Sequence, residues 1–340
     1  MRVPQAIPGF QLSRRDSLRL LASGAALAGL GLTALRPAHA AQAWPAKALR
    51  IIVPFAPGGG ADGSARVLGE ALAPQLGQAV IVDNKPGAGS AIGVAAALQS
   101  RDGHTLLMGS NSMVINPFLN PAAKYDVTRD FDAVGMVSSQ PLVLVVPAAS
   151  ALKSVKDVVA HAKAKPDELS AGNSGTGTLA HIASESFAAQ AGIQLTPVAY
   201  KGESALMPDL ISGQVSLGFL NLPSVLTHIK SGRLRALAVS SAQPVSDLPG
   251  VPTLVSQGYP TMEFEGWATL VAPKGSIPPE GLARLQALLS AALESDAVRK
   301  RFTALGVAPM VRSQQATGQF LKEESERYAA IIKSRNIKVD

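Results

Sequence analysis

Residues Leu49–Arg66, LRIIVPFAPGGGADGSAR, contain the stretch that decides the fold class. Its first part, Leu49–Phe55, is an apolar, β-branched run of the kind that a strand buried on both faces shows. The glycines behind it open a predicted helix. Glycine lets a backbone approach a ligand closely, and the first N–H groups of a helix have no partner inside the helix, so they can hold an anion or a carbonyl oxygen. We expect a ligand to bind at this turn.

Short apolar runs and amphipathic stretches alternate from this point to Ser139, as they do in βαβ units. The strands expected here are Ile51–Phe55, Ala79–Val82 and Thr105–Met108. Because helical stretches separate them, the pattern predicts a parallel sheet.

The order of strand, glycine loop and helix occurs a second time. Leu169–Ala171 is the end of a predicted strand, Gly172–Thr178 (GNSGTGT) is a loop, and Leu179–Gln190 is a helix closed by Gly192. Ser154, with Asp157 three residues on, indicates the start of an earlier helix. Further strands are expected at Leu195–Tyr200, Val215–Phe219 and Leu234–Ser240.

Two apolar strands, Leu142–Pro147 and Trp267–Ala272, each run to a proline, and we expect them to be the paired crossings between two lobes. A helical tail begins at Pro278, and we expect it to pack back on the first lobe. We therefore predict an α/β protein of two βα lobes with helices on both faces of each sheet. Lobe 1 is expected at residues 41–145 plus 265–340 and lobe 2 at residues 146–264, with helix N-termini facing a shared cleft.

The N-terminal 40 residues have the features of a cleaved export signal. Arg14 and Arg15 precede an uncharged stretch, Leu20–Leu35, and Ala38–Ala40 form a cleavage site of the A-x-A type. The paired arginines favour the twin-arginine route, although Ser17 stands where a large apolar residue is more usual. The uncharged stretch is shorter than the roughly 20 apolar residues of a spanning helix, which disfavours the alternative of a retained membrane anchor.

Composition excludes several classes of function. The net charge is +7, but residues 1–40 hold five arginines and one aspartate, so residues 41–340 carry only +3. Aromatic residues make up 4% of the chain and no run of clustered Lys or Arg occurs, which argues against a nucleic-acid partner. The chain has no cysteine, which excludes disulfides, thiolate metal sites and cysteine nucleophiles.

A dinucleotide site is the main alternative. Gly58, Gly60 and Gly63 satisfy G-x-G-x-x-G after a strand, and Asp83 stands where a ribose-binding acid belongs, which is the pattern of an exported NAD(P)-dependent oxidoreductase. Against it, Pro57 lies inside the turn, and Asn84–Gly93 repeats a glycine loop where such a unit needs none.

Other chemistry has weaker support. No Gly-Lys-Ser/Thr follows the glycines, so a P-loop is excluded. Ser174 misses the G-x-S-x-G elbow by one position, and His181, on the helix after it, is interpreted as structural. The histidines after residue 40, His104, His161, His181 and His228, show no paired spacing, so we expect no metal site.

The chain is rich in loops that expose backbone N–H and hydroxyl groups. Ala56–Asp62, Gly87–Ile92 and Ser174–Thr178 each place Gly, Ser or Thr at a helix start, where the helix dipole favours a carboxylate. This inventory indicates binding without catalysis.

Several motifs occur together along the chain: Val53–Gly59 with Asp62 and Arg66, Asn84 with Pro86–Gly89 and Ile92–Gly93, Asp102–Gly103 before Thr105–Leu106, Gly175, Gly177, Thr178 and His181, Tyr200–Gly202, and Gly213–Val215. In this combination the chain resembles the Bug-type periplasmic substrate-binding proteins of tripartite tricarboxylate transporters. The resemblance covers essentially all of residues 41–340, with His104 where Tyr is usual.

The resemblance implies a type II periplasmic-binding-protein fold that closes on a small organic carboxylate, without enzymatic activity or a cofactor. It also implies delivery to integral membrane transporter subunits, and we expect a monomer. Nothing in the sequence separates this use from signalling through a sensor protein. With the loops above, the candidate ligand-binding residues are Phe55, Ala56, Pro57, Gly58, Gly59, Asp62, Gly87, Ala88, Gly89, Asn111, Ser174, Gly175, Thr176, Gly177, Thr178, Tyr200 and Asn221.

Two departures from the family pattern bear on the ligand. Leu220 stands where the family often has an acidic residue, and Ser216 replaces a frequent Asp. If Leu220 lines the pocket, a ligand amino group lacks a counter-charge there. On that condition we expect a dicarboxylate or an aromatic carboxylate rather than an amino acid.

Overall fold

The computed structural model describes residues 44–335 and residue 337. The chain from Pro45 onward forms one compact unit. The predicted export signal, residues 1–40, lies outside the described residues. Within the described residues, no helix has both the length and the apolar character that crossing a membrane requires.

The N-terminal βα units form as predicted. Strand β1 (Leu49–Val53) pairs in parallel with β2 (Val80–Asn84) and with β3 (Thr105–Ser110). Helix α2 (Gly60–Leu76) begins directly behind the glycine run, and its apolar face packs on the sheet. The remaining elements of this part are the short helix η1 (Ala88–Ser90), α3 (Ala91–Gln99), α4 (Asn111–Leu119) and α5 (Val127–Asp130).

Strand β4 (Phe131–Pro147) is much longer than the predicted strand Leu142–Pro147. Its first part, up to Pro141, pairs antiparallel with β9 (Glu265–Pro273). Its last part pairs instead with β7 (Leu217–Asn221) and β8 (Leu234–Val239). The two strands predicted to cross between the lobes do pair with each other, but through residues 131–141 of β4 rather than through residues 142–147. Residues 131–140 contain Asp, Gly, Ser and Gln, and so lack the continuous apolar run that would have marked them as strand.

The middle of the chain repeats the βα pattern. Strand β5 (Ser170–Asn173) is parallel to β6 (Thr196–Ala199) and to β7. The helices are α6 (Val155–Ala164), α7 (Leu179–Ala191), α8 (Glu203–Ser212) and α9 (Leu222–Lys230), with a short helix η2 at Val255–Gln257. The predicted helix start at Ser154 is confirmed, because the Ser154 hydroxyl accepts a hydrogen bond of 3.1 Å from the Asp157 N–H.

The C-terminal helices return to the N-terminal units, as predicted. Helices α10 (Pro279–Glu294) and α11 (Asp296–Leu305) pack on α2, and α12 (Gln314–Ser334) packs on α4 and β4. The short strand β10 (Ala308–Pro309) pairs with β4. The break between α10 and α11 was not predicted.

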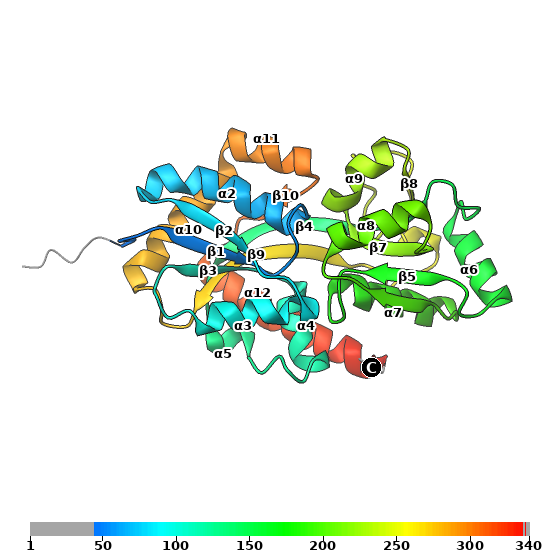
Figure 1. Ribbon diagram of the computed structural model, residues 1–340, viewed down its shortest axis with the longest axis horizontal. Helices are drawn as coiled ribbons and strands as arrows, with labels where there is room; N and C mark the ends of the chain where they lie inside the picture. The colour runs from blue at the N-terminus through cyan, green and yellow to red at the C-terminus, as the bar shows by residue number, and fades with distance from the viewer. Residues whose placement is uncertain (1–43, 336, 338–340) are drawn as a thin grey trace, which may run out of the picture. The chain divides into compact units, whose positions relative to one another are not determined.

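Strands β4 and β9 join two groups of βα units (Figure 1). The strand order is β2-β1-β3-β9-β4-β7-β5-β6, so β9 and β4 lie in the middle of one continuous sheet. The N-terminal units and α10 to α12 surround one half, and α6 to α9 surround the other (Figure 1). The lobe boundaries expected from the sequence, residues 41–145 plus 265–340 and residues 146–264, stay predictions.

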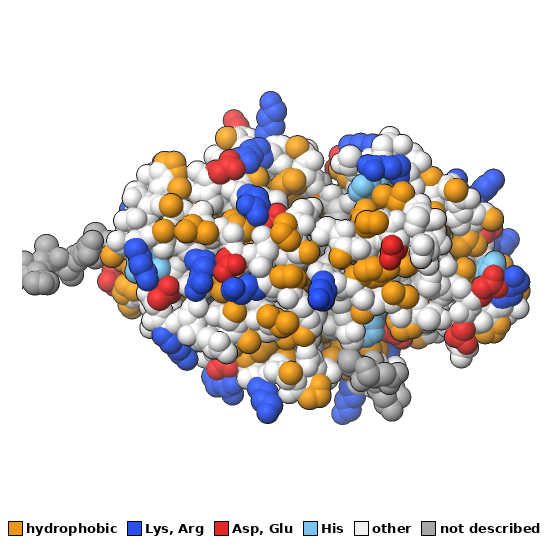
Figure 2. Space-filling model, viewed as in Figure 1, with side chains coloured by type: hydrophobic (Ala, Val, Ile, Leu, Met, Phe, Trp, Pro, Cys, Tyr) orange, Lys and Arg blue, Asp and Glu red, His pale blue; other side chains and the backbone are white. Residues whose placement is uncertain are grey.

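Charged side chains are dispersed on the face shown in Figure 2. Lys and Arg occur there singly or in small groups, with Asp and Glu between them. A mixed surface of this kind does not concentrate positive potential in one place.

Candidate functional site

A pocket lies where the two groups of βα units meet at the crossing strands β4 and β9. It encloses about 710 Å³, part of which is open to solvent. Its lining residues are Phe55, Ala56, Gly59, Gly60, Ala61, Asp62, Ser110, Asn111, Ser112, Ser138, Gln140, Ser174, Thr178, Leu179, Ala180, Glu203, Asn221, Trp267 and Ala268. Most of the polar residues among them are neutral.

Helices α2, α4, α7, α8 and α9 all begin at this pocket. Their first residues or N-caps, among them Gly59, Ser110, Thr178 and Asn221, belong to the lining. The N-terminus of a helix carries a partial positive charge and exposes N–H groups without partners. No Lys, Arg or His is among the lining residues. The positive electrostatic potential in the pocket therefore comes, among the described lining residues, from these helix N-termini.

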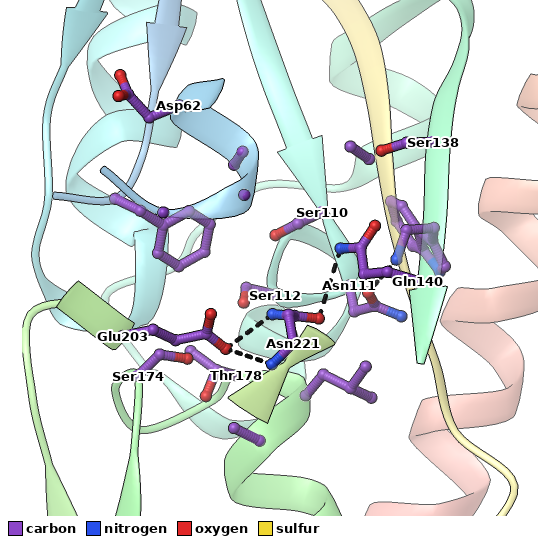
Figure 3. Close-up of a pocket in the computed structure, with 18 of the residues that line it drawn as sticks. Asp62, Ser110, Asn111, Ser112, Ser138, Gln140, Ser174, Thr178, Glu203 and Asn221 are labelled. Carbon is purple, nitrogen blue, oxygen red and sulfur yellow. Dashed lines mark hydrogen bonds between the residues drawn. The ribbon is translucent and has the colours of Figure 1, made fainter. Parts of the chain in front are cut away.

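The loop before α2 is held in place by Asp62. The Gly58 N–H donates to its Oδ2 at 3.0 Å and the Arg66 Nε donates to the same atom at 3.1 Å. Burial raises the pKa of Asp62, but the hydrogen bonds from Arg66 and Gly58 outweigh it and lower the pKa below its usual range. In Figure 3 the Asp62 carboxylate points away from the other labelled groups, so its role is to shape the loop.

Glu203 lies at the opposite side of the pocket and is only 8% exposed. Its Oε1 accepts hydrogen bonds from the Asn221 backbone N–H at 2.9 Å and from Asn221 Nδ2 at 2.8 Å (Figure 3). Its Oε2 accepts a hydrogen bond from the Ser224 hydroxyl. Burial raises the pKa of Glu203, although these hydrogen bonds act in the opposite direction.

Asn111 joins the pocket to the crossing strands. Its Nδ2 donates to the Glu265 carbonyl at 3.0 Å and to the Tyr328 hydroxyl at 3.1 Å, while its Oδ1 accepts from the Trp267 N–H at 3.0 Å. The Trp267 Nε1 donates in turn to Glu324 on α12 at 2.8 Å. Asn111 therefore fixes the wall of the pocket.

Gln140 and Ser110 each present a buried oxygen that has no hydrogen-bond partner within the described residues. The Gln140 Nε2 is near Asn221 Oδ1 at 3.4 Å, which leaves its Oε1 free. Ser110 is the N-cap of α4 and makes no side-chain capping bond. Buried polar atoms are normally paired, so these two are candidates for contact with a ligand or with water.

The loop Ser174–Thr178 closes the pocket at the start of α7. The Thr178 hydroxyl donates to the Gly175 carbonyl at 2.7 Å and accepts from the His181 N–H at 3.4 Å, so it caps the helix. Ser174 is 9% exposed and lines the pocket beside it. Figure 3 shows both side chains near Glu203.

Glycines bring this loop against the loop Gly87–Ser90. A Cβ on Gly89 would lie 1.9 Å from the Thr176 carbonyl oxygen, and a Cβ on Gly177 would lie 2.5 Å from Asn116 Oδ1. The Asn116 amide also donates to the Gly89 carbonyl. The two loops thus meet through their backbones at Gly89 and Thr176, in a contact that a side chain at Gly89 would prevent.

Comparison with known proteins agrees with this geometry. The profile of a family described as tripartite tricarboxylate transporter family receptor matches residues 64–337. The chain belongs to this family.

Individual relatives of the receptor extend the likeness to most of the chain. It is 37% identical to Protein BugT of Bordetella pertussis over 302 residues, which are 88% of this chain and 92% of BugT. The structure of the periplasmic binding protein BugD has a TM-score of 0.83 and 28% identity, covering 87% of this chain and 99% of BugD. The R. palustris protein Rpa4515 with adipate also has a TM-score of 0.83, with 30% identity over 87% of this chain and 99% of that chain. The predicted two-lobed periplasmic-binding-protein fold and the Bug-type resemblance are confirmed.

The pocket of the receptor brings together part of the predicted set of binding residues. Those that line it are Phe55, Ala56, Gly59, Asp62, Asn111, Ser174, Thr178 and Asn221. Those that do not line it are Pro57, Gly58, Gly87, Ala88, Gly89, Gly175, Thr176, Gly177 and Tyr200. Gly58 instead binds Asp62, the Tyr200 hydroxyl donates to Asp209 at 2.5 Å, and Gly89 and Thr176 contact each other.

Gly60 and Ala61, inside the predicted loop Ala56–Asp62, also line the pocket. Other lining residues were missed by the sequence analysis: Ser110, Ser112, Ser138, Gln140, Leu179, Ala180, Glu203, Trp267 and Ala268. A signal existed for Ser110 and Ser112, because Ser110 ends β3 and Ser112 comes just after it, and β3 is next to β1 in the sheet. Ser138 and Gln140 lie inside a long strand, where no sequence pattern marks a site.

The expectation of a dicarboxylate or an aromatic carboxylate rested on the condition that Leu220 lines the pocket, and Leu220 does not line it. Leu220 is fully buried in the core of α8, α9 and the end of β4, and it is absent from the pocket lining. Ser216 bonds to Ser170 between neighbouring strands. The acidic residue of this side of the pocket is Glu203, so the argument from Leu220 against a ligand amino group has no structural basis.

The residues of the dinucleotide alternative do not form a site in the receptor. Asp83 faces Arg50 at 3.8 Å and Lys85 at 3.4 Å. A Cβ on Gly63 would meet the Leu305 side chain at 3.2 Å, so this glycine serves the packing of α2 against α11. Neither Asp83 nor Gly63 lines the pocket.

Proposed function

We propose that this receptor captures a small organic carboxylate in the pocket and delivers it to integral membrane transporter subunits, without enzymatic activity. The observation that carries the proposal is a pocket lined by helix N-termini and mostly by neutral hydroxyl and amide groups, with no basic side chain among its lining residues. Helix N-termini stabilise an anion. Since they hold it without a fixed cation, the anion can be released again to a membrane partner.

Two relatives support a carboxylate ligand and a periplasmic location for this receptor. Rpa4515, at 30% identity, is described with adipate, and BugD is described as a periplasmic binding protein.

We propose that residues 1–40 direct this chain to the periplasm by the twin-arginine route and are removed after Ala40. Mass spectrometry of the exported protein would test this, and a chain that retains Met1–Ala40 would contradict it.

A thermal-shift screen tests the proposed function. Residues 41–340 are heated with dicarboxylates, aromatic acids, amino acids and NAD(P). A ligand at a hundred times its dissociation constant adds about 2.7 kcal/mol to the free energy of unfolding, which raises the melting temperature measurably. We expect shifts with carboxylates. A shift with NAD(P) and none with any carboxylate would contradict the proposal and restore the dinucleotide alternative.

Ser174→Ala combined with Thr178→Ala tests the second loop. We expect affinity for the carboxylate to fall roughly 10-fold to 100-fold, because hydrogen bonds to a charged group contribute about 1.5–3 kcal/mol each and one of the two hydroxyls already caps α7. Stability should fall by about 1 kcal/mol through loss of the cap. Isothermal titration calorimetry measures the affinity.

Ser186→Ala is the matched control for this double variant. Ser186 is a fully buried serine on the same helix, α7. Its hydroxyl has no hydrogen-bond partner among the residues that the structure describes, and it does not line the pocket. Its affinity should equal that of the unaltered protein. Unchanged affinity in the double variant would remove the loop Ser174–Thr178 from the binding site.

A further inference from the structure

Glu203 is a buried acidic side chain in a pocket that is proposed to bind an anion. This inference rests on that proposed function. The pocket is proposed to take an anion, yet Glu203 lines it and is 8% exposed. No Lys, Arg or His among the lining residues compensates its charge. With Glu203 ionised, a bound carboxylate would place two like charges in one enclosed space, which disfavours ionisation of the weaker acid.

The hydrogen bonds of Glu203 are compatible with a neutral acid. Oε1 accepts both bonds from Asn221, and it can do so whether or not the carboxyl group is protonated. Oε2 contacts the Ser224 hydroxyl, which can reverse direction and accept a bond from a protonated Oε2. Protonation therefore breaks no contact that the structure shows.

The titratable groups on the elements packed around Glu203 do not supply a compensating cation. Across the pocket, Asp62 is bound by Arg66. On α7, burial lowers the pKa of His181, which keeps this ring neutral at neutral pH.

On α9, burial and then the neighbouring Arg233 lower the pKa of His228. His228 and Arg233 line a separate surface pocket, which Ser224 also lines. On the loop before α8, Lys201 is exposed and Tyr200 is bound to Asp209. Burial is also the largest influence on Glu203 itself and raises its pKa.

We propose that Glu203 is the neutral acid in the ligand-bound receptor, so that capture of one carboxylate takes up one proton from solvent onto Glu203 Oε2. The proton donates to Ser224 Oγ, and Oε1 continues to orient the Asn221 side chain. Glu203 thereby decides the charge of the ligand that the pocket accepts. It admits an anion as the neutral acid, whereas a ligand with an ammonium group would keep it ionised.

The expected measurement is a proton-linked affinity. Once Glu203 is ionised in the free receptor, binding requires protonation, so affinity falls by up to about tenfold for each unit that the pH rises. Calorimetric titration of adipate, succinate and benzoate into the purified protein, at about pH 5.5 and about pH 8 in buffers of different ionisation enthalpy, counts the protons taken up. We expect an uptake that approaches one proton per ligand at the higher pH.

Glu203→Gln separates this proposal from a general effect of pH. The carboxamide can keep the bonds of the neutral acid, accepting from Asn221 and donating to Ser224, so the variant should bind without proton uptake and with affinity independent of pH. Glu185→Gln is the matched control: burial also raises the pKa of Glu185, which lies on α7 outside the pocket lining. It should bind like the unaltered protein.

Ser224→Ala provides a second variant should Glu203→Gln not fold. It removes a donor to the carboxylate, so Glu203 becomes protonated more easily in the free receptor and the uptake of protons on binding should shrink. Carboxylate binding with no proton uptake at either pH, or uptake that persists in Glu203→Gln, would overturn the proposal. Binding of none of the three acids at either pH would overturn the proposed function, and this inference with it.

Discussion

Gly89→Ala is expected to reduce ligand affinity by roughly 30-fold to 1000-fold. An alanine Cβ would lie 1.9 Å from the Thr176 carbonyl oxygen, and Gly89 has a φ of +57°, in the left-handed region. The backbone conformation costs an alanine about 1 kcal/mol, and overpacking adds about 1–3 kcal/mol, with a tenfold loss for each 1.4 kcal/mol. We expect the receptor to need this contact between the loops Gly87–Ser90 and Ser174–Thr178 when it holds its ligand. Calorimetric titration with the best ligand of the screen measures the loss.

Gly192→Ala separates the clash from the backbone strain. Gly192 has a φ of +60°, close to that of Gly89, but a Cβ there would meet no atom of the described part of the chain within 4 Å. This control should lose about 1 kcal/mol of stability and keep its affinity. If Gly89→Ala bound as tightly as Gly192→Ala, the contact between the two loops would not belong to the bound state. If it instead unfolded far more easily than the control, the loops would also be in contact without ligand.

Trp267→Ala is expected to have the largest effect on stability, a loss of about 3–5 kcal/mol. Trp267 is 2% exposed, its ring packs edge-on against Phe320 at 5.6 Å between centroids, and its Nε1 donates to Glu324. Removal leaves a cavity between β9 and α12 and takes one donor from a buried carboxylate. Because Trp267 also lines the pocket, ligand affinity should fall as well. Urea unfolding followed by circular dichroism measures the free energy of unfolding.

Trp267→Phe divides this effect into its parts. Phenylalanine keeps an aromatic ring for Phe320 but lacks the N–H, so Glu324 loses this donor while it keeps its bond from Arg327 at 3.0 Å. The expected loss is about 1–3 kcal/mol, the range for a buried group that loses one partner. Equal losses in the two variants would contradict the cavity argument and assign the whole effect to the hydrogen bond.

The fold was accessible from the sequence wherever its signals are local. The apolar run at Leu49 followed by glycines identified β1 and the start of α2, and Ser154 identified the start of α6. The long crossing strand was only half recognised. Residues 131–140 of β4 are polar in part because Ser138 and Gln140 face the pocket, and that requirement appears only when β9 and the helix starts are in place.

The sequence by itself determined the α/β class, the order of βα units, and which loops place N–H groups and hydroxyls at helix starts. These features depend on residues close together in the chain, so their patterns can be read directly. Only the tertiary structure decided which of these groups share a pocket. It placed Gly89 against Thr176, Leu220 in the core and Glu203 beside Asn221, because such contacts are set by how α8, β7 and the crossing strands pack together. No short pattern encodes that packing, since each contact joins residues far apart in sequence.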